Sequence, residues 1–195
     1  MKKKFLLLLV TLILPISLAQ PVLAAECVIP PEGGVLPEIN LHVPQDAAGR
    51  DYLGIGGKGS FKISRIKAET VIIEIFSMYC PYCQKEAPLV NELYQLINKR
   101  RDLKDKIKMI GIGAGNTPFE VEIFKNEYKV PFPLFSDESF TIHKSLGQVR
   151  TPYFFVIKIN ADGSHKILYS KGGTIQDPNQ FLGMILKSLG LKQEG

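Results

Sequence analysis

The sequence contains few cysteines: Cys27, Cys80 and Cys83 in a chain of 195 residues. Small exported domains that rely on disulfides for stability carry many more, usually in even number, so these cysteines do not staple the fold. No second Cys-x-x-Cys and no nearby histidine completes a metal site around Cys80 and Cys83. Cys27 is left over as an idle thiol, a partner for a second chain or an unused remnant.

The sequence also lacks internal repeats, low-complexity tracts and basic runs interleaved with aromatic residues. The absence of basic runs argues against a nucleic-acid partner, because proteins that bind nucleic acids contact the phosphates through clustered Lys and Arg. The net charge of +5 comes partly from Lys2, Lys3 and Lys4, so removal of residues 1–25 would lower it to +2. About 170 residues would remain, which is enough for one domain with its own core.

An uninterrupted apolar run of membrane-spanning length is missing as well. Residues 5–14 are apolar, but Pro15 follows them, and a spanning helix needs about 20 apolar residues. With lysines before this run and small residues after it, residues 1–25 are typical of a secretory signal peptide. We therefore expect a periplasmic or secreted protein after cleavage. The alternative is an uncleaved N-terminal segment that anchors the chain in a membrane.

The most informative motif that is present is Cys80-Pro81-Tyr82-Cys83, between an apolar run that ends at Phe76 and a helical pattern. Two thiols three positions apart, at the start of a helix, have the geometry of a dithiol–disulfide redox centre. The helix N-terminus favours the thiolate of the first cysteine, because unpaired N–H groups and a partial positive charge lie beside its sulfur. Pro81 suits the first helical position because it has no N–H.

The hydrophobic pattern predicts an α/β chain. A lead-in rich in Pro and Gly over residues 26–60 is expected to be irregular apart from one short strand at 38–43. The elements expected after it are strands 71–76 and 107–112, a helix 81–98, a helix opened by a capping box at Thr117, a short helix 138–146, a hairpin of 153–159 with 166–169, and a last helix capped by Asp177. This order gives a central mixed β-sheet with helices on both faces.

Three segments resemble the thioredoxin fold and, within it, exported thiol–disulfide oxidoreductases of the TlpA/ResA-like redoxin family. They are the Cys-x-x-Cys-x-x-Glu-x-Pro of residues 80–88, the Val-Pro-Phe-Pro segment of residues 130–137, and the segment around Thr-Pro at residues 146–157. The domain organisation that follows is a signal peptide at 1–25, the lead-in at 26–60 and a thioredoxin-like domain at 61–195.

The resemblance implies a role for each candidate residue. Cys80 would attack as the nucleophile, and Cys83 would resolve the mixed disulfide. Pro152 would be a cis-proline that faces the disulfide. The backbone of Thr151, together with Pro81 and Tyr82, would contact an extended substrate peptide. No metal and no cofactor is expected beyond the redox-active disulfide Cys80–Cys83 itself.

Glu74 is an acid inside the strand predicted to be buried, six residues before Cys80. An apolar environment raises the pKa of a carboxyl group, which lets it hold and pass a proton near neutral pH. Thioredoxin-like proteins commonly place an acid at this offset, where it assists proton loss from the resolving thiol. The alternative is a strand-end glutamate that reaches solvent. Glu86 and Pro88 are expected to be structural, as an acid on the helix surface and a kink.

The function expected is exchange of the dithiol with disulfides of exported proteins, as a reductant of the cytochrome c maturation type fed by a membrane dithiol donor. Glu74 and the glutaredoxin-like Pro81-Tyr82 keep a DsbA-like oxidant or isomerase, with a membrane acceptor, open. A peroxiredoxin-type peroxidase is a further alternative, although Ile73 and Ser77 stand where that chemistry expects Pro and Thr. A Cu(I)-binding module is the non-enzymatic alternative.

Overall fold

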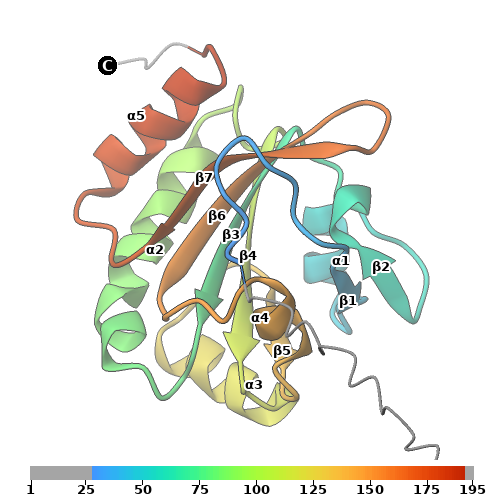
Figure 1. The fold of residues 1–195 in the computed structure, drawn as a ribbon, viewed down its shortest axis with the longest axis vertical. Coiled ribbons are helices and arrows are strands. Elements are labelled where there is room, and N and C mark those ends of the chain that lie inside the picture. Colours follow the sequence, from blue (N-terminus) through green and yellow to red (C-terminus); the bar gives the residue numbers. More distant parts are fainter. Residues whose placement is uncertain (1–27, 192–195) are drawn as a thin grey trace, which may run out of the picture.

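The computed structural model describes residues 28–191 (Figure 1). The predicted signal peptide and Cys27 lie outside the described residues. Between residues 28 and 191, no helix combines the length and the apolar character that crossing a bilayer requires.

Five strands form a mixed sheet, and two short strands form a separate ribbon. The described elements are β1 (Asn40–His42), α1 (Ala47–Leu53), β2 (Ser60–Lys62), a 3₁₀ turn (Ile63–Arg65), β3 (Thr70–Phe76), α2 (Pro81–Lys99), β4 (Ile107–Ala114), α3 (Pro118–Glu127), β5 (Leu134–Asp137), α4 (Thr141–Ser145), β6 (Tyr153–Ile159), β7 (His165–Gly172) and α5 (Pro178–Ser188). The sheet order is β5-β4-β3-β6-β7, with β3, β4 and β5 parallel and β6 and β7 antiparallel to their neighbours. The mixed sheet expected from the sequence is confirmed.

Both faces of this sheet are covered, as expected (Figure 1). Val71 and Ile75 of β3 face one core, to which α1 and the β1–β2 ribbon also contribute. Ile72 and Phe76 face the other core, which α2, α3 and α5 close. Every residue of β3 is buried, so its continuous apolar run is that of a central strand.

Helix α1 lies in the segment for which the sequence predicts irregular structure and one strand. The carboxylate of Asp46 accepts a hydrogen bond from the amide of Gly49 at 2.6 Å, and so caps the start of α1. Gly54 ends the helix in the left-handed region at a φ of 63°. Both signals are present in the sequence, but the surrounding Pro and Gly residues obscure them.

Helix α4 is shorter than the expected 138–146, because its start is set from outside the helix. Asp137, at the end of β5, accepts hydrogen bonds from the amides of Ile142 at 3.0 Å and His143 at 2.7 Å. Phe140 adopts a left-handed conformation, with a φ of 58°, so it cannot belong to the helix. Gly147, at a φ of 85°, follows the end of α4, as expected.

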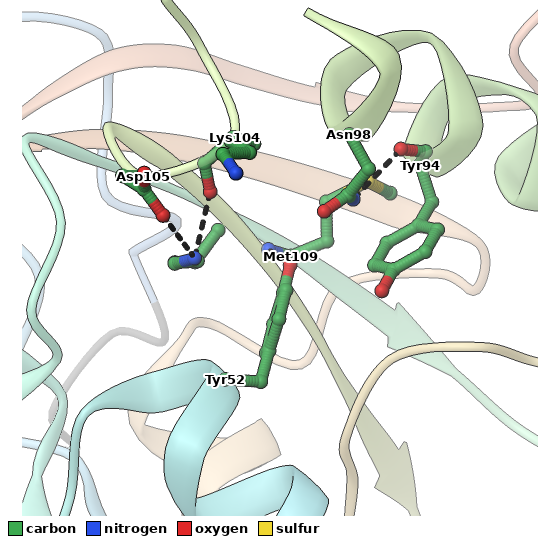
Figure 2. A network of polar contacts seen from close by, with 7 residues as sticks. Tyr52, Tyr94, Asn98, Lys104, Asp105 and Met109 are labelled. Carbon is green, nitrogen blue, oxygen red and sulfur yellow. Dashed lines mark hydrogen bonds and ion pairs between the residues drawn. The ribbon is translucent and has the colours of Figure 1, made fainter. Parts of the chain in front are cut away.

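A polar network fastens α1 to the sheet (Figure 2). It lies near the start of β4, whereas the cysteine motif follows the end of the neighbouring β3. The hydroxyl of Tyr52 accepts a hydrogen bond from the amide of Met109 at 2.8 Å, at a position on β4 that β5 does not reach. The ammonium of Lys108 lies 4.6 Å from the centre of the Tyr52 ring and donates to the carbonyl of Lys104 at 2.7 Å. Tyr52 therefore gives a buried strand amide its partner.

We predict that Tyr52→Phe lowers the free energy of unfolding by about 1–3 kcal/mol, because the amide of Met109 stays buried and loses its acceptor. Denaturant unfolding of the oxidised protein measures this difference. Tyr82→Phe is the matched control, since the Tyr82 side chain is exposed and its change is expected to stay within about 0.5 kcal/mol. Equal stability of Tyr52→Phe and the parent would contradict the role of this bond.

Candidate active site

The cysteine motif lies at the junction of β3 and α2. Cys80 is the residue that precedes the first turn of α2, and its amide donates to the carbonyl of Ser77 at 3.0 Å. Pro81 occupies the start of the helix, as predicted from its missing N–H. Cys80 is half-buried, whereas Cys83 is fully buried against the core beneath α2. One thiol therefore meets solvent and the other does not.

Two side chains hold the loop that delivers Cys80 to the helix. The amide of Met78 donates to the Oδ1 of Asn116 at 2.9 Å, and the Nε2 of Gln84 donates to the carbonyl of Met78 at 2.7 Å. Asn116 is fully buried two residues after the end of β4. No role was predicted for it from the sequence, although a polar residue shortly after a predicted buried parallel strand is a signal for such a position.

The Cys80 thiol is more acidic than an ordinary cysteine. Partial burial by itself raises its pKa, but hydrogen bonds from the side chain of Thr151 and from the amides of Cys83 and Tyr82 outweigh burial and bring the pKa below its usual value. The neutral thiol donates to the carbonyl of Thr151 at 3.3 Å, a bond that exists only while the proton is present. The amides at the start of α2 therefore stabilise the thiolate.

The Cys83 thiol shows the opposite behaviour. Burial raises its pKa well above the usual value, and the nearby Cys80 and Glu74 raise it further, although a hydrogen bond with the backbone of Ser77 opposes them. Cys83 therefore stays protonated while Cys80 ionises. For Cys83 to attack as a thiolate, another group has to take its proton.

Glu74 is buried on the face of β3 that lies beneath α2, between Ile72 and Phe76. Burial raises the pKa of its carboxyl group to about 8, and the neighbouring Glu86 and Cys80 act in the same direction. The alternative of a glutamate that reaches solvent at the strand end is wrong. The expected environment is present, and the proton-transfer role of Glu74 stays a prediction.

The sequence predicts that Glu86 lies on the helix surface, and this prediction is wrong. Only 1 % of it is exposed, and its Oε1 accepts a hydrogen bond from the amide of Ile175 at 2.6 Å, while its Oε2 is buried without a partner. Burial raises the pKa of this carboxyl group to about 7. A charged residue in a helix usually lies on the exposed face. Here the segment before α5, which contains Ile175, covers Glu86. The sequence around Glu86 cannot predict a contact with so distant a segment.

The Thr151–Pro152 segment faces the cysteine motif, and its peptide bond is cis. Thr151, Pro152 and Tyr82 line one groove of about 690 Å³ beside Cys80, and the Tyr82 side chain is exposed. Pro81 is exposed at the start of α2 and is not among the groove residues. The structure thus brings the predicted residues to one end of the sheet. Their roles stay predictions.

Between residues 28 and 191, no group of three or more His, Cys, Asp or Glu side chains is placed to hold a metal ion. The chemistry that this arrangement supports is that of its two thiols: an accessible, acidic sulfur, a second sulfur one helical turn deeper, and two buried carboxyl groups of raised pKa nearby. The fold and the site together define the class of thioredoxin-fold thiol–disulfide oxidoreductases.

Comparison with known proteins agrees with this class. The family model described as AhpC/TSA matches residues 43–166, and the chain belongs to this family. A thiol-disulfide oxidoreductase named ResA from Bacillus thuringiensis subsp. konkukian is 25 % identical over 126 residues, which are 65 % of this chain and 69 % of that protein. ResA from Bacillus cereus is 26 % identical over 62 % of this chain and 66 % of that protein. The resemblance to ResA-like redoxins is confirmed.

Solved structures show the same fold. StoA from Bacillus subtilis superposes with a TM-score of 0.55 at 19 % identity, over 77 % of this chain and 98 % of that one. A thiol:disulfide interchange protein from a Bacteroides species gives a TM-score of 0.59 at 15 % identity, over 85 % of this chain and 95 % of that one. At these identities the likeness is one of fold, and it confirms the expected thioredoxin-like architecture.

We predict that iodoacetamide at neutral pH modifies Cys80 and spares Cys83 in the folded, reduced protein, because only the Cys80 thiolate is both accessible and stabilised. Peptide mass spectrometry of a Cys27→Ser variant identifies the modified residue. The pH dependence of the rate is expected to show an inflection below the value of 9.0 for a free thiol. In Cys80→Ser the remaining Cys83 is expected to stay unmodified; equal modification of both thiols would contradict the assignment.

We predict that Glu74→Gln flattens the pH dependence of stability in the oxidised protein. The raised pKa means that folded Glu74 keeps a proton that the unfolded chain has lost, so stability falls as the pH rises from about 4.5 to about 8. The expected slope is up to roughly 1.4 kcal/mol per pH unit. Denaturant unfolding across this range measures it. Glu92→Gln, an exposed position on α2, is the control; the same slope in Glu74→Gln as in the control would refute the buried-acid assignment.

Proposed function

We propose that the protein exchanges its Cys80–Cys83 dithiol with disulfides of other proteins, and that it acts as a reductant. This proposal rests on one observation: the pKa values of two thiols on the same helical turn are shifted in opposite directions. The pKa of Cys80 is lowered at the start of α2, and the pKa of the buried Cys83 is raised. An acidic, accessible thiol starts an exchange, and a deeper thiol ends it.

In the proposed reaction, the Cys80 thiolate attacks one sulfur of a substrate disulfide, and the other substrate sulfur leaves as a thiolate. Cys83 then attacks the sulfur of Cys80, which releases the second substrate sulfur and leaves the Cys80–Cys83 disulfide. Two electrons pass from the protein to the substrate. The proton of Cys83 goes to the carboxylate form of Glu74, whose pKa of about 8 makes it a usable base near neutral pH.

The charges around the thiols support the reducing direction. Strong oxidants of this fold stabilise the thiolate of their reduced form. Here burial and the nearby Glu74 raise the pKa of Cys83, so its thiolate is disfavoured and the reduced form gains no stabilisation at this sulfur. The lowered pKa of Cys80 and the Pro81-Tyr82 dipeptide favour the opposite direction, so a DsbA-like oxidant is the second candidate.

The proposed setting is outside the cytoplasm, with disulfide-bearing exported proteins as partners and cytochrome c apoproteins as the substrates of first choice. The support is the signal-like pattern of residues 1–25, and an uncleaved anchor is the alternative. A membrane dithiol donor would return Cys80 and Cys83 to the reduced form. The peroxidase alternative is less well supported, because Cys83 follows Cys80 by only three residues. The Cu(I) alternative is less well supported because, between residues 28 and 191, no third His, Cys, Asp or Glu is grouped with the two thiols.

The test is a trapping experiment with Cys83→Ala, in which a mixed disulfide on Cys80 cannot be resolved. We predict that this variant, expressed in its native host, retains haem-attachment apoproteins, whereas the parent retains none. The Cys80→Ala/Cys83→Ala variant is the matched control, because it also reports anything held by Cys27. Mass spectrometry identifies the trapped proteins. A broad mixture of folding exported proteins would indicate the oxidant instead, and no trapped protein would contradict exchange altogether.

A further inference from the structure

The groove beside Thr151 and Pro152 has a wall that comes from the far end of the sequence. We name residues 28–34 the N-terminal strap. The strap pairs with the edge strand β7, where the amide of Gly33 donates to the carbonyl of Ile167 at 2.8 Å and the amide of Ile167 donates to the carbonyl of Gly34 at 2.9 Å. The hydroxyl of Ser170 donates to the carbonyl of Pro30 at 2.7 Å. These bonds fix the strap to the sheet.

A close backbone contact fixes the first residues of the strap as well. Gly147, after α4, lies so near to Ile29 that a Cβ built on it would come within 2.7 Å of the Cα of Ile29. Gly147 also has a φ of 85°, so both space and conformation require glycine at this position. The backbone of Ile29 is thereby held against the segment that leads to Thr151, while 40 % of Ile29 stays exposed.

Ile29 and Tyr82 line the groove together with Thr151 and Pro152. The lining is largely apolar, and Arg150 is the charged residue among the groove residues that the structure describes. Because the carbonyl of Thr151 lies 3.3 Å from the Sγ of Cys80, a peptide whose cysteine is bonded to Cys80 has the groove directly beside it. The residues flanking that cysteine enter an apolar site with one positive charge at its rim.

We propose that the strap selects substrates: the groove takes an extended peptide that carries a large apolar side chain and an acidic residue within a few positions of its cysteine. Ile29 and Tyr82 contact the apolar side chain, and Arg150 attracts the acid. This inference rests on the proposed exchange function and names its substrate class. It assigns a specificity role to a segment that lies well before the cysteine motif in the chain.

Two synthetic peptides test the proposal, each with one cysteine held as a mixed disulfide with glutathione. One carries Leu and Glu beside the cysteine, and the other carries Ser and Lys at the same positions. The fully reduced protein is mixed with each peptide, and the second-order rate constant for peptide release in a single turnover is measured. We expect the Leu/Glu peptide to react at least about 10-fold faster than the Ser/Lys peptide, as an apolar pocket distinguishes side chains by about 10- to 200-fold.

Ile29→Ala is expected to lower the rate with the Leu/Glu peptide by about 5- to 20-fold and to leave the Ser/Lys peptide unchanged. Ile123→Ala is the matched control, because Ile123 is equally exposed, at 40 %, but lies on α3 and not in the groove. Arg150→Ala is expected to reduce the preference for Glu over Lys, by a factor that shrinks at high salt.

The outcomes separate the inference from the function on which it rests. If the parent reduces neither peptide, the exchange function fails. If it reduces both peptides and Ile29→Ala changes both rates equally, or changes neither, exchange stands and the strap has no part in selection. Reduction of 2,2′-dipyridyl disulfide, which carries no peptide and no carboxylate, reports the dithiol separately from peptide binding. An unchanged rate of this reaction in Ile29→Ala supports the proposal, and a reduced rate would overturn it by assigning Ile29 to the integrity of the centre.

Discussion

The contact on which the site depends is that between the sulfur of Cys80 and the first amides of α2. It exists because β3 ends at Phe76 and the chain turns within three residues into a helix whose first position is a proline. The amides of Tyr82 and Cys83 then have no partner within the helix and are directed at the sulfur. Asn116 and Gln84 form hydrogen bonds with the backbone of Met78, and these bonds fix the turn that positions Cys80.

The same helix gives its two thiols opposite properties. Cys80, at the helix start, is half-buried and meets hydrogen-bond donors, whereas Cys83, one turn later, is buried above Glu74. The two acids Glu74 and Glu86 share this region, and each raises the energy of further negative charge there. The site can therefore hold one negative charge at the surface sulfur and resists a second one beneath it. This asymmetry is the physical basis of the proposed order, in which Cys80 attacks first and Cys83 second.

The sequence alone predicted those parts of the fold that local chemistry determines. The apolar run of β3, the proline after Cys80 and the capping box at Thr117 each specify an element whose signals lie within a few neighbouring residues, and all three elements are present. The environment of Glu74 followed from its place inside a buried strand.

The parts that the sequence did not predict depend on contacts between distant segments. Burial of Glu86 needs the amide of Ile175, and the role of Asn116 needs the turn at Met78, so periodicity could not reveal either. Helix α1 is a different case, because its capping signals at Asp46 and Gly54 were available in the sequence.

The strap also changes how the sheet meets other chains. An open sheet ends in two rows of unpaired backbone groups, and such edges add foreign strands readily. Under the proposed exchange with other proteins, extended segments of a substrate could add to such an edge without reaching the sulfur of Cys80. Here the bonds of Gly33 and Gly34 to Ile167 occupy part of the β7 border, and the opposite border is the four-residue strand β5. That part of the β7 border is therefore closed to strand addition, next to the groove that the proposed substrate peptide would enter.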